Sequence, residues 1–280
     1  MERIVNRTMD EERALYALRD AVVEHCTFAG PADGESALKE ARNVAVRDCT
    51  FSLRYPFWHT EDFSVENCVL EEGVRAPLWY ARNGRFDNCS VLGVKCLREC
   101  EGISFANCTV VSEEFGWRCR RIDLSDSEIT AVYFLFETKG GSLKNVKMKG
   151  KYPFQYTEDL TVEDCDLDTK DAFWHSKNVT VKNCTVKGEY LGWYSEGLTL
   201  INCKIIGTQP LCYCKNLTLI DCTMEGTDLS FEYSEVNATV KGSIDSVKNP
   251  ASGSITADRI GQVILENSVM ETHCRIITNS

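Results

Sequence analysis

Hydrophobic and polar residues alternate along most of this chain, and the alternation returns with a period of 19 residues. The clearest copies read Asp159-Leu-Thr-Val-Glu-Asp-Cys165, Asn178-Val-Thr-Val-Lys-Asn-Cys184, Gly197-Leu-Thr-Leu-Ile-Asn-Cys203 and Asn216-Leu-Thr-Leu-Ile-Asp-Cys222. Alternation with a period of two predicts short β-strands, and a fixed period near 20 residues is typical of stacked repeat architectures. We therefore predict an all-β fold built from stacked coils.

Taking the cysteine as position zero extends the register to eleven copies. The residues three before and two after zero are apolar in every copy, which predicts an inward face on either side of a bend. The bend itself carries Asn or Asp immediately before zero in ten copies, and these residues tolerate the left-handed conformation of a tight turn. The zero positions are Cys26, Cys49, Cys68, Cys89, Cys108, Ser127, Val146, Cys165, Cys184, Cys203 and Cys222.

The pattern predicts one right-handed, single-stranded parallel β-helix domain over residues 1–280. About eleven coils occupy 16–235, an N-terminal cap covers 1–15, and a C-terminal cap covers 236–280, where the register dissolves. Terminal segments of repeat proteins depart from the consensus in this way. Each coil is expected to hold three short strands and three turns.

A third column lies ten residues before zero and contains all five tryptophans. Two residues later the side chains are small, as in Ser176 and Ser195, and we expect both columns to point inward. A tryptophan column that faced solvent would instead form a platform for stacking sugars. If the inward assignment holds, Trp174 and Trp193 stack in adjacent coils, and Trp174→Ala destabilises the protein far more than His175→Ala.

The repeated phrase Asn178-Val-Thr-Val-Lys-Asn-Cys-Thr-Val186 resembles the right-handed parallel β-helix of the pectate-lyase superfamily. The whole pattern, including Gly242-Ser-Ile-Asp-Ser-Val-Lys-Asn-Pro-Ala-Ser-Gly253, is most similar to a bacterial family called domain of unknown function 3737. This family brings no assigned activity, whereas better-studied members of the superfamily are polysaccharide lyases and hydrolases. The sequence lacks the Asn-Thr-Asp, Asp-Asp, Gly-His-Gly and Arg-Ile-Lys motifs of the polygalacturonases and an acidic calcium cluster like that of the pectate lyases. The resemblance therefore assigns no catalytic residue.

The column nine residues before zero is expected to point outward, on the strand that carries the substrate groove in related β-helices. Its companion eleven residues before zero, which includes Phe57, Leu135 and Phe173, is expected on the same outer face. Aromatic rings flanking charged groups are typical of a carbohydrate groove. The predicted ligand-binding residues are His59, Tyr80, Tyr156, His175, Tyr194 and Tyr213, and the predicted catalytic residues are Glu99, Arg118 and Glu137.

Glu99 and Glu137 lie two coils apart, or about 9.6 Å at a rise of about 4.8 Å per coil. This separation is near the upper edge of the window for inverting glycosidases, about 6.5–9.5 Å. Arg118 between them could bind an acidic sugar, but it would also lower the pKa of both carboxyl groups and disfavour a general acid. A Glu-Arg-Glu salt-bridge ladder on a solvated face is the main alternative, ahead of ligand binding and catalysis.

Composition restricts the partners and the compartment. The chain has 42 acidic and 31 basic residues, a net charge of −11, which disfavours nucleic acids and anionic membranes. The N-terminus lacks the apolar segment of a secretory signal, so we expect a cytoplasmic protein with reduced thiols.

Nine of the fifteen cysteines occupy position zero and are read as small apolar core residues. Cys96 with Cys100 and Cys212 with Cys214 have metal-like spacing, but core packing is favoured, and no metal or cofactor is predicted.

Two functional hypotheses follow. The first is a carbohydrate-binding or carbohydrate-processing protein, a glycoside hydrolase or polysaccharide lyase if it is an enzyme, that works through the face from His59 to Tyr213. The second is a non-catalytic scaffold whose regular surface binds a protein partner or associates with itself.

Overall fold

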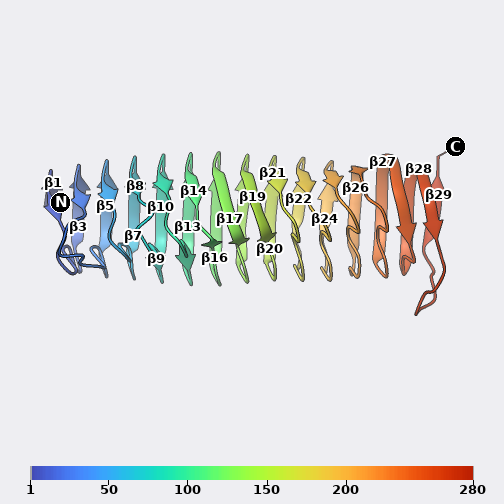
Figure 1. The fold of residues 1–280 in the computed structure, drawn as a ribbon, viewed down its shortest axis with the longest axis horizontal. Coiled ribbons are helices and arrows are strands. Elements are labelled where there is room, and N and C mark those ends of the chain that lie inside the picture. Colours follow the sequence, from blue (N-terminus) through green and yellow to red (C-terminus); the bar gives the residue numbers. More distant parts are fainter. Residues whose placement is uncertain (1, 280) are drawn as a thin grey trace. The chain divides into compact units, whose positions relative to one another are not determined.

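The computed structural model describes residues 2–279, and it divides the chain into two compact units, Met1–Gly141 and Ser142–Ser280. Each unit is a parallel β-solenoid in which successive strands of each main ladder pair in parallel from one turn to the next (Figure 1). None of residues 2–279 belongs to a helix that could cross a membrane. The prediction of an all-β parallel solenoid is confirmed, while the prediction of a single domain stays a prediction. Met1 and Ser280, the ends of the predicted caps, lie outside the described residues.

In the first unit, two ladders of parallel strands form two sides of each turn. The first ladder contains β1 (Glu2–Val5), β3 (Arg19–Glu24), β5 (Arg42–Arg47), β7 (Glu61–Glu66), β10 (Arg82–Asp87), β13 (Glu101–Ala106) and β16 (Arg120–Ser125). The second contains β2 (Thr8–Met9), β4 (Thr27–Phe28), β6 (Thr50–Phe51), β8 (Val69–Leu70), β11 (Ser90–Val91), β14 (Thr109–Val111) and β17 (Glu128–Phe134). The third side is less regular and holds β9 (Leu78–Trp79), β12 (Leu97–Arg98) and β15 (Glu114–Phe115).

The second unit has the same construction, and β18 (Lys139–Lys144) contains the boundary between the units. Its first ladder contains β20 (Glu158–Glu163), β22 (Thr180–Lys182), β24 (Thr199–Ile201), β26 (Leu217–Glu225), β27 (Glu235–Lys248), β28 (Ser252–Ile264) and β29 (Arg275–Thr278). Its second ladder contains β19 (Lys147–Pro153), β21 (Asp166–Asp168), β23 (Thr185–Lys187) and β25 (Lys204–Ile206), which pairs with the end of β26.

The predicted number of coils was too low. The first ladders hold seven strands in each unit, and β18 adds one, so residues 2–279 form 15 turns rather than about eleven. The predicted N-terminal cap already contains β1 and β2, which pair in register with β3 and β4. In the predicted C-terminal cap, β27 and β28 run through the bend as long continuous strands. They need no Asn-Cys turn there, so the sequence marker disappears while the solenoid continues.

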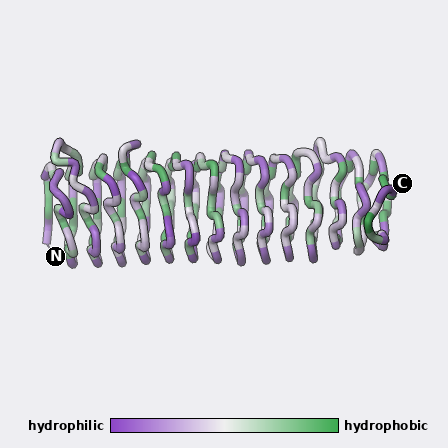
Figure 2. Tube along the Cα trace, turned by 60° about the horizontal axis from the view of Figure 1, so that its bottom comes forward, coloured by the Kyte–Doolittle hydropathy of each residue, from purple (hydrophilic) through white to green (hydrophobic). Residues whose placement is uncertain are grey.

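The inward columns form the core of each unit. Val162, Val181, Leu200 and Leu219, three residues before zero, are paired in register and at most 2% exposed. Figure 2 shows hydrophobic and hydrophilic stretches alternating around every turn. The left-handed bend is also present, since Asn183 and Asn202 have φ values of 53° and 52°. Their side-chain amides bond along the column, with Asn202 Nδ2 donating to Asn183 Oδ1 at 3.0 Å.

The cysteine column is buried as predicted, but its thiols are more than apolar fillers. The backbone N–H of Cys165 donates to Sγ of Cys184 in the next turn at 3.3 Å. Cys184 Sγ in turn donates to the carbonyl of Lys182 at 3.0 Å. Ser127 has the same role, because its Oγ accepts from the N–H of Cys108 at 3.0 Å. The column therefore satisfies an N–H that the tight bend turns into the core.

Candidate functional site

The predicted outer strand is a corner. All nine predicted site residues have φ between 51° and 60°, the left-handed region that non-glycine residues seldom adopt. Two residues earlier in the chain, several residues are left-handed too, including Phe154 at 62° and Phe173 at 63°. Two left-handed residues in such a short segment break the strict in-out alternation of a strand. We name this turn the third-side corner.

The companion column therefore points inward, which corrects the expectation that it shared the outer face. Its non-glycine members are at most 1% exposed, and they provide the large side chains of the core on this side. They are Phe57, Leu78, Leu97, Leu135, Phe154, Phe173 and Leu211. The glycines of the column, Gly116 and Gly192, are left-handed, with φ of 77° and 71°. The small column eight residues before zero is buried as predicted, with Ser176 and Ser195 at most 1% exposed.

The tryptophans are half-buried at the corner, so their fully inward assignment was wrong, although the predicted stack exists. The rings of Trp174 and Trp193 are parallel within 6°, with centroids 5.6 Å apart. Their indole N–H groups donate at 2.7 Å to the carbonyls of Tyr190 and Gln209 in the following turns. The two rings cover each other's facing sides, and Trp193 also contacts the rings of Tyr190 and Tyr213, so these faces are closed to a sugar.

In the first unit, the predicted site residues separate into an aromatic pair and a charged group. His59 and Tyr80 stack with centroids 5.0 Å apart, beside the stacked pair Trp58 and Trp79. Arg118 Nε bonds to Glu137 Oε2 at 2.8 Å, and both side chains are at least 40% exposed. Glu99 lies at the same corner one turn before Arg118, and it is exposed. This arrangement matches part of the predicted salt-bridge ladder, and no observation tests the catalytic roles.

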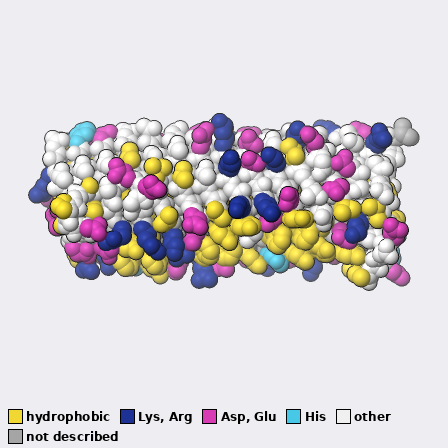
Figure 3. All heavy atoms as spheres, in the orientation of Figure 1, with side chains coloured by type: hydrophobic (Ala, Val, Ile, Leu, Met, Phe, Trp, Pro, Cys, Tyr) yellow, Lys and Arg dark blue, Asp and Glu magenta, His cyan; other side chains and the backbone are white. Residues whose placement is uncertain are grey.

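In the second unit, the corner carries a continuous stack that we name the aromatic ladder: Tyr156, His175, Tyr194, Tyr213 and Tyr233. Successive ring centroids are 4.8, 5.0, 4.8 and 5.9 Å apart. The interplanar angles are 6°, 9° and 13° for the first three pairs and 43° for the last. The structure thus brings four predicted ligand-binding residues together. Figure 3 shows hydrophobic side chains, with a His among them, in a continuous band where the view holds β20 to β26.

Tyr233 is the member that the sequence reasoning missed. A strict 19-residue register places Glu232 at this corner, but the turn after Tyr213 has one extra residue. The signal for the shift was Ser234, whose Oγ accepts from the N–H of Cys214 at 2.9 Å and so occupies the small inward position. The strict register expects a cysteine at position 241, where the chain has Lys241, and counting back from there gives Glu232. Taking Ser234 as the small inward residue of this turn would have placed Tyr233 in the ladder.

Stacking covers the faces of the inner rings and leaves their edges toward the surface, while the Tyr233 hydroxyl at the end of the ladder accepts from the N–H of Val269 at 3.3 Å. Tyr156 and Tyr194 are 48% and 46% exposed, while His175, Tyr213 and Tyr233 are half-buried. Burial raises the pKa of the Tyr213 hydroxyl, so this group remains a hydrogen-bond donor at neutral pH. The ladder therefore presents a ridge of ring edges and donors.

A second row runs beside the ladder, two residues further along each turn. It consists of Glu158, Lys177, Glu196, Lys215 and Glu235, and we name it the charge row. Backbone bridges hold its first four members in register, from Glu158 to Lys177, to Glu196 and to Lys215. Lys177, Glu196, Lys215 and Glu235 are exposed. The second unit thus carries an aromatic row and a row of alternating sign, side by side.

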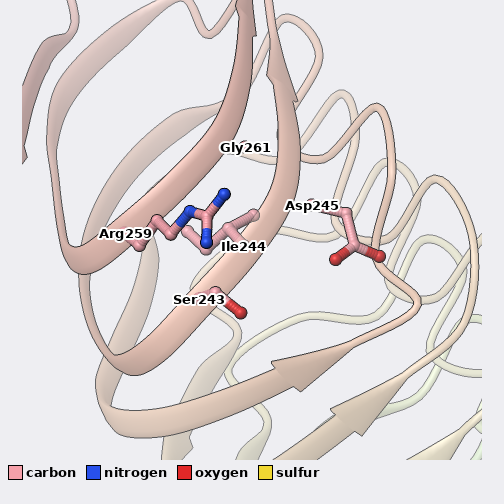
Figure 4. A pocket seen from close by; sticks show the side chains of 5 residues that line it. All are labelled: Ser243, Ile244, Asp245, Arg259 and Gly261. Carbon is pink, nitrogen blue, oxygen red and sulfur yellow. The ribbon is translucent and has the colours of Figure 1, made fainter.

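The other candidate features are weaker. All fifteen cysteines are free, and Cys96, Cys100, Cys212 and Cys214 are buried. Within residues 2–279, His, Cys, Asp and Glu nowhere form a group of three or more that could hold a metal ion. An open hollow of about 350 Å³ lies against β27 and β28, lined in part by Asp245 and Arg259. Figure 4 shows the Asp245 carboxylate turned away from the Arg259 guanidinium, so the two do not converge on one ligand.

Comparison with one solved structure supports the fold. The structure of PfbA, a surface adhesin of Streptococcus pneumoniae, is similar with a TM-score of 0.53 and 6% identity, covering 86% of this chain and 84% of that one. The A-module of the mannuronan C-5 epimerase AlgE4 of Azotobacter vinelandii has a TM-score of 0.32 and 10% identity, with 91% and 90% covered. A comparison with curated proteins gives no match. The model of the family described as "Protein of unknown function (DUF3737)" matches residues 2–277, and this chain therefore belongs to that family.

Proposed function

We propose that this protein acts by binding a protein partner along the aromatic ladder of the second unit. The observation that carries the proposal is the stack of five aromatic side chains, of which Tyr156 and Tyr194 are 48% and 46% exposed. Tyrosine is enriched at protein interfaces because it offers a large amphipathic surface with little conformational entropy to lose. Stacking between the turns restricts these side chains further, so binding costs still less entropy.

The same stack disfavours a sugar platform, since the inner ring faces are already covered by neighbouring rings. A protein partner needs only apolar contact with the edges and hydrogen bonds to the hydroxyl groups. The corner backbone is also fixed, because the N–H of His175 donates to the carbonyl of Trp193 at 2.9 Å. The ladder is therefore a preformed contact surface.

Carbohydrate binding is the second candidate, and the parallel rows favour it. Tyrosine hydroxyl groups lie beside Lys and Glu side chains along one line, and an extended polysaccharide could bond to both rows. Under this candidate, Glu99, Arg118 and Glu137 of the first unit remain the proposed catalytic group. A reducing-sugar assay with Glu137→Gln tests that role, and unchanged hydrolysis by this variant would remove Glu137 from it.

The experiment places a photo-crosslinking aromatic amino acid at position 194 in cells that make the protein. Position 16 provides the matched control, since Tyr16 is 53% exposed and lies outside the ladder. Protein adducts specific to position 194 would support the proposal, and glycan adducts would select the second candidate. Equal labelling from positions 16 and 194 would refute a binding role for the ladder.

A further inference from the structure

Four members of the charge row, from Lys177 to Glu235, lack ion-pair partners within residues 2–279 of their own chain. Lys177, Glu196, Lys215 and Glu235 are all exposed, and none makes an ion pair with another of residues 2–279. The corresponding row of the first unit differs, because two of its carboxylates are neutralised internally. There, Arg42 pairs with Glu61 at 3.4 Å, and Arg121 pairs with Glu101 at 3.0 Å. From Lys177 to Glu235, the second unit therefore presents a row of exposed charges of alternating sign, without ion pairs to other residues of 2–279, next to an aromatic stack.

A row that alternates in sign is complementary to itself when reversed. From Lys177 to Glu235 the signs run plus, minus, plus, minus, and an antiparallel copy reads minus, plus, minus, plus against them. The members follow one another in successive turns, so the two rows have the same spacing. A parallel copy in the same register would instead place Lys against Lys and Glu against Glu, which is unfavourable.

We propose that the partner of the aromatic ladder is a second copy of this chain, packed antiparallel across a twofold axis. We place the axis between the turns of Glu196 and Lys215, because this position pairs all four charges from Lys177 to Glu235. Glu196 then faces Lys215 of the second copy, and Lys177 faces Glu235 of the second copy. Each pair occurs twice, as an isologous interface requires. The proposal rests on the proposed function and names the partner of the same surface.

The same axis matches the aromatic ladder with itself. The twofold axis lies in the plane of the interface and runs perpendicular to the two rows. It therefore places the aromatic ladder of one copy over that of the other, and the charge row over the charge row. Tyr194 then packs against Tyr213 of the second copy at the centre, and His175 lies opposite Tyr233 of the second copy. Apolar ring edges thus form the centre of the contact, and the charge pairs fix its antiparallel direction.

Sedimentation-velocity measurements on the full chain test the proposal through a charge swap. Wild-type protein should dimerise, with a dissociation constant on the order of 1–100 µM for a contact of modest size. Glu196→Lys and Lys215→Glu should each weaken the dimer about tenfold or more, because each turns two attractive pairs into repulsive ones. The double variant should restore wild-type association, since the two exchanged side chains again face each other across the axis with opposite charges. Asp166→Lys, the same charge change on an exposed residue of β21, should have no comparable effect.

Several outcomes would overturn the proposal. One is a wild-type chain that stays monomeric at roughly 100 µM. Another is a dimer whose dissociation constant rises equally with Asp166→Lys and with Glu196→Lys. The third is a double variant whose dimer stays weaker than that of the wild type. Circular dichroism of each variant shows whether it is folded. A monomer whose position 194 crosslinks to another protein would leave the proposed function in place while refuting self-association.

Discussion

Replacing Phe173 by alanine tests the central correction at the third-side corner, where the phenylalanine column packs inside and the tryptophans are half-buried. Phe173 is 1% exposed, and its ring stacks on Phe154 with centroids 4.7 Å apart. A buried aromatic side chain removes about 150–250 Å² from water, worth roughly 4–6 kcal/mol at about 25 cal/mol per Å². Compact unfolded chains reduce that figure, so we expect Phe173→Ala to cost about 3–5 kcal/mol.

Trp174→Phe is the matched control, one residue further along the same turn. It keeps an aromatic ring in the stack with Trp193 and removes the hydrogen bond from Nε1 to the carbonyl of Tyr190. A neutral hydrogen bond contributes about 0.5–1.5 kcal/mol, so this variant should lose about 1–2 kcal/mol.

Urea unfolding followed by circular dichroism measures both variants. Because turns of a solenoid can unfold separately, hydrogen exchange of peptides around residue 173 should accompany the equilibrium curves. Faster exchange should be concentrated in the turns next to Phe173. A loss below about 1 kcal/mol for Phe173→Ala, together with more than about 3 kcal/mol for Trp174→Phe, would show that the columns are assigned the wrong way round.

Three further predictions concern the bend and the thiols. Asn183→Ala should lower the free energy of unfolding in urea by about 1–2 kcal/mol, since it removes the side-chain hydrogen bonds with Asp164 and Asn202 and places alanine at φ 53°. Asn183→Gly should lower it less, because glycine tolerates that φ. A thiol reagent should label Cys274 first in native protein, because the other fourteen cysteines are buried, and fast labelling of those fourteen would contradict the core. Burial raises the pKa of Cys212 to about 12 and of Cys214 to about 11, from 9.0. Their contribution to stability should therefore be complete below pH 9 and fall as pH rises toward 11–12, a decline that Cys214→Ser should reduce.

The solenoid could be predicted because every turn needs the same core and bend side chains, and these recur in the sequence at a fixed spacing. Val181 and Leu200 pair in register, as their 19-residue separation required. A parallel stack places equivalent residues of successive turns about 4.8 Å apart, so a periodic core column and a periodic Asn bend define the architecture. The number of turns was less accessible, because β27 and β28 pass the bend without the Asn-Cys signature.

The orientation of the third side could not be obtained from alternation. A period of two assumes extended backbone throughout, whereas Phe173 and His175 both adopt left-handed φ. One signal was available. Gly116 and Gly192 appear in a column otherwise filled by large apolar residues, which is unusual for a strand but expected where φ is positive. If these glycines had been interpreted as corner residues, the sequence would have predicted that the Phe173 side chain points inward.

The thiol column shows a similar limit of residue-type reasoning. Cysteine was read as a small apolar residue, which accounts for its burial but not for its repetition. In the structure, Cys184 Sγ accepts the N–H of Cys165, and a hydroxyl does the same at Ser127. The exchange of Cys for Ser at one turn was the signal that position zero needs an acceptor. Val146 at the same position offers no acceptor, so such a need was not evident from every copy.

The columns that vary between turns are the candidates for a recognition surface, since columns shared by all turns maintain the fold. The corner is such a column, with Glu99 and Arg118 in the first unit and Tyr194 and Tyr213 in the second. The sequence located this column but could not show that its rings are stacked. Stacking follows from the left-handed corner, which repeats the same side-chain direction at each turn. It leaves edges rather than faces for a partner, and this geometry, together with the alternating charges beside it, favours a second protein surface over a stacked sugar.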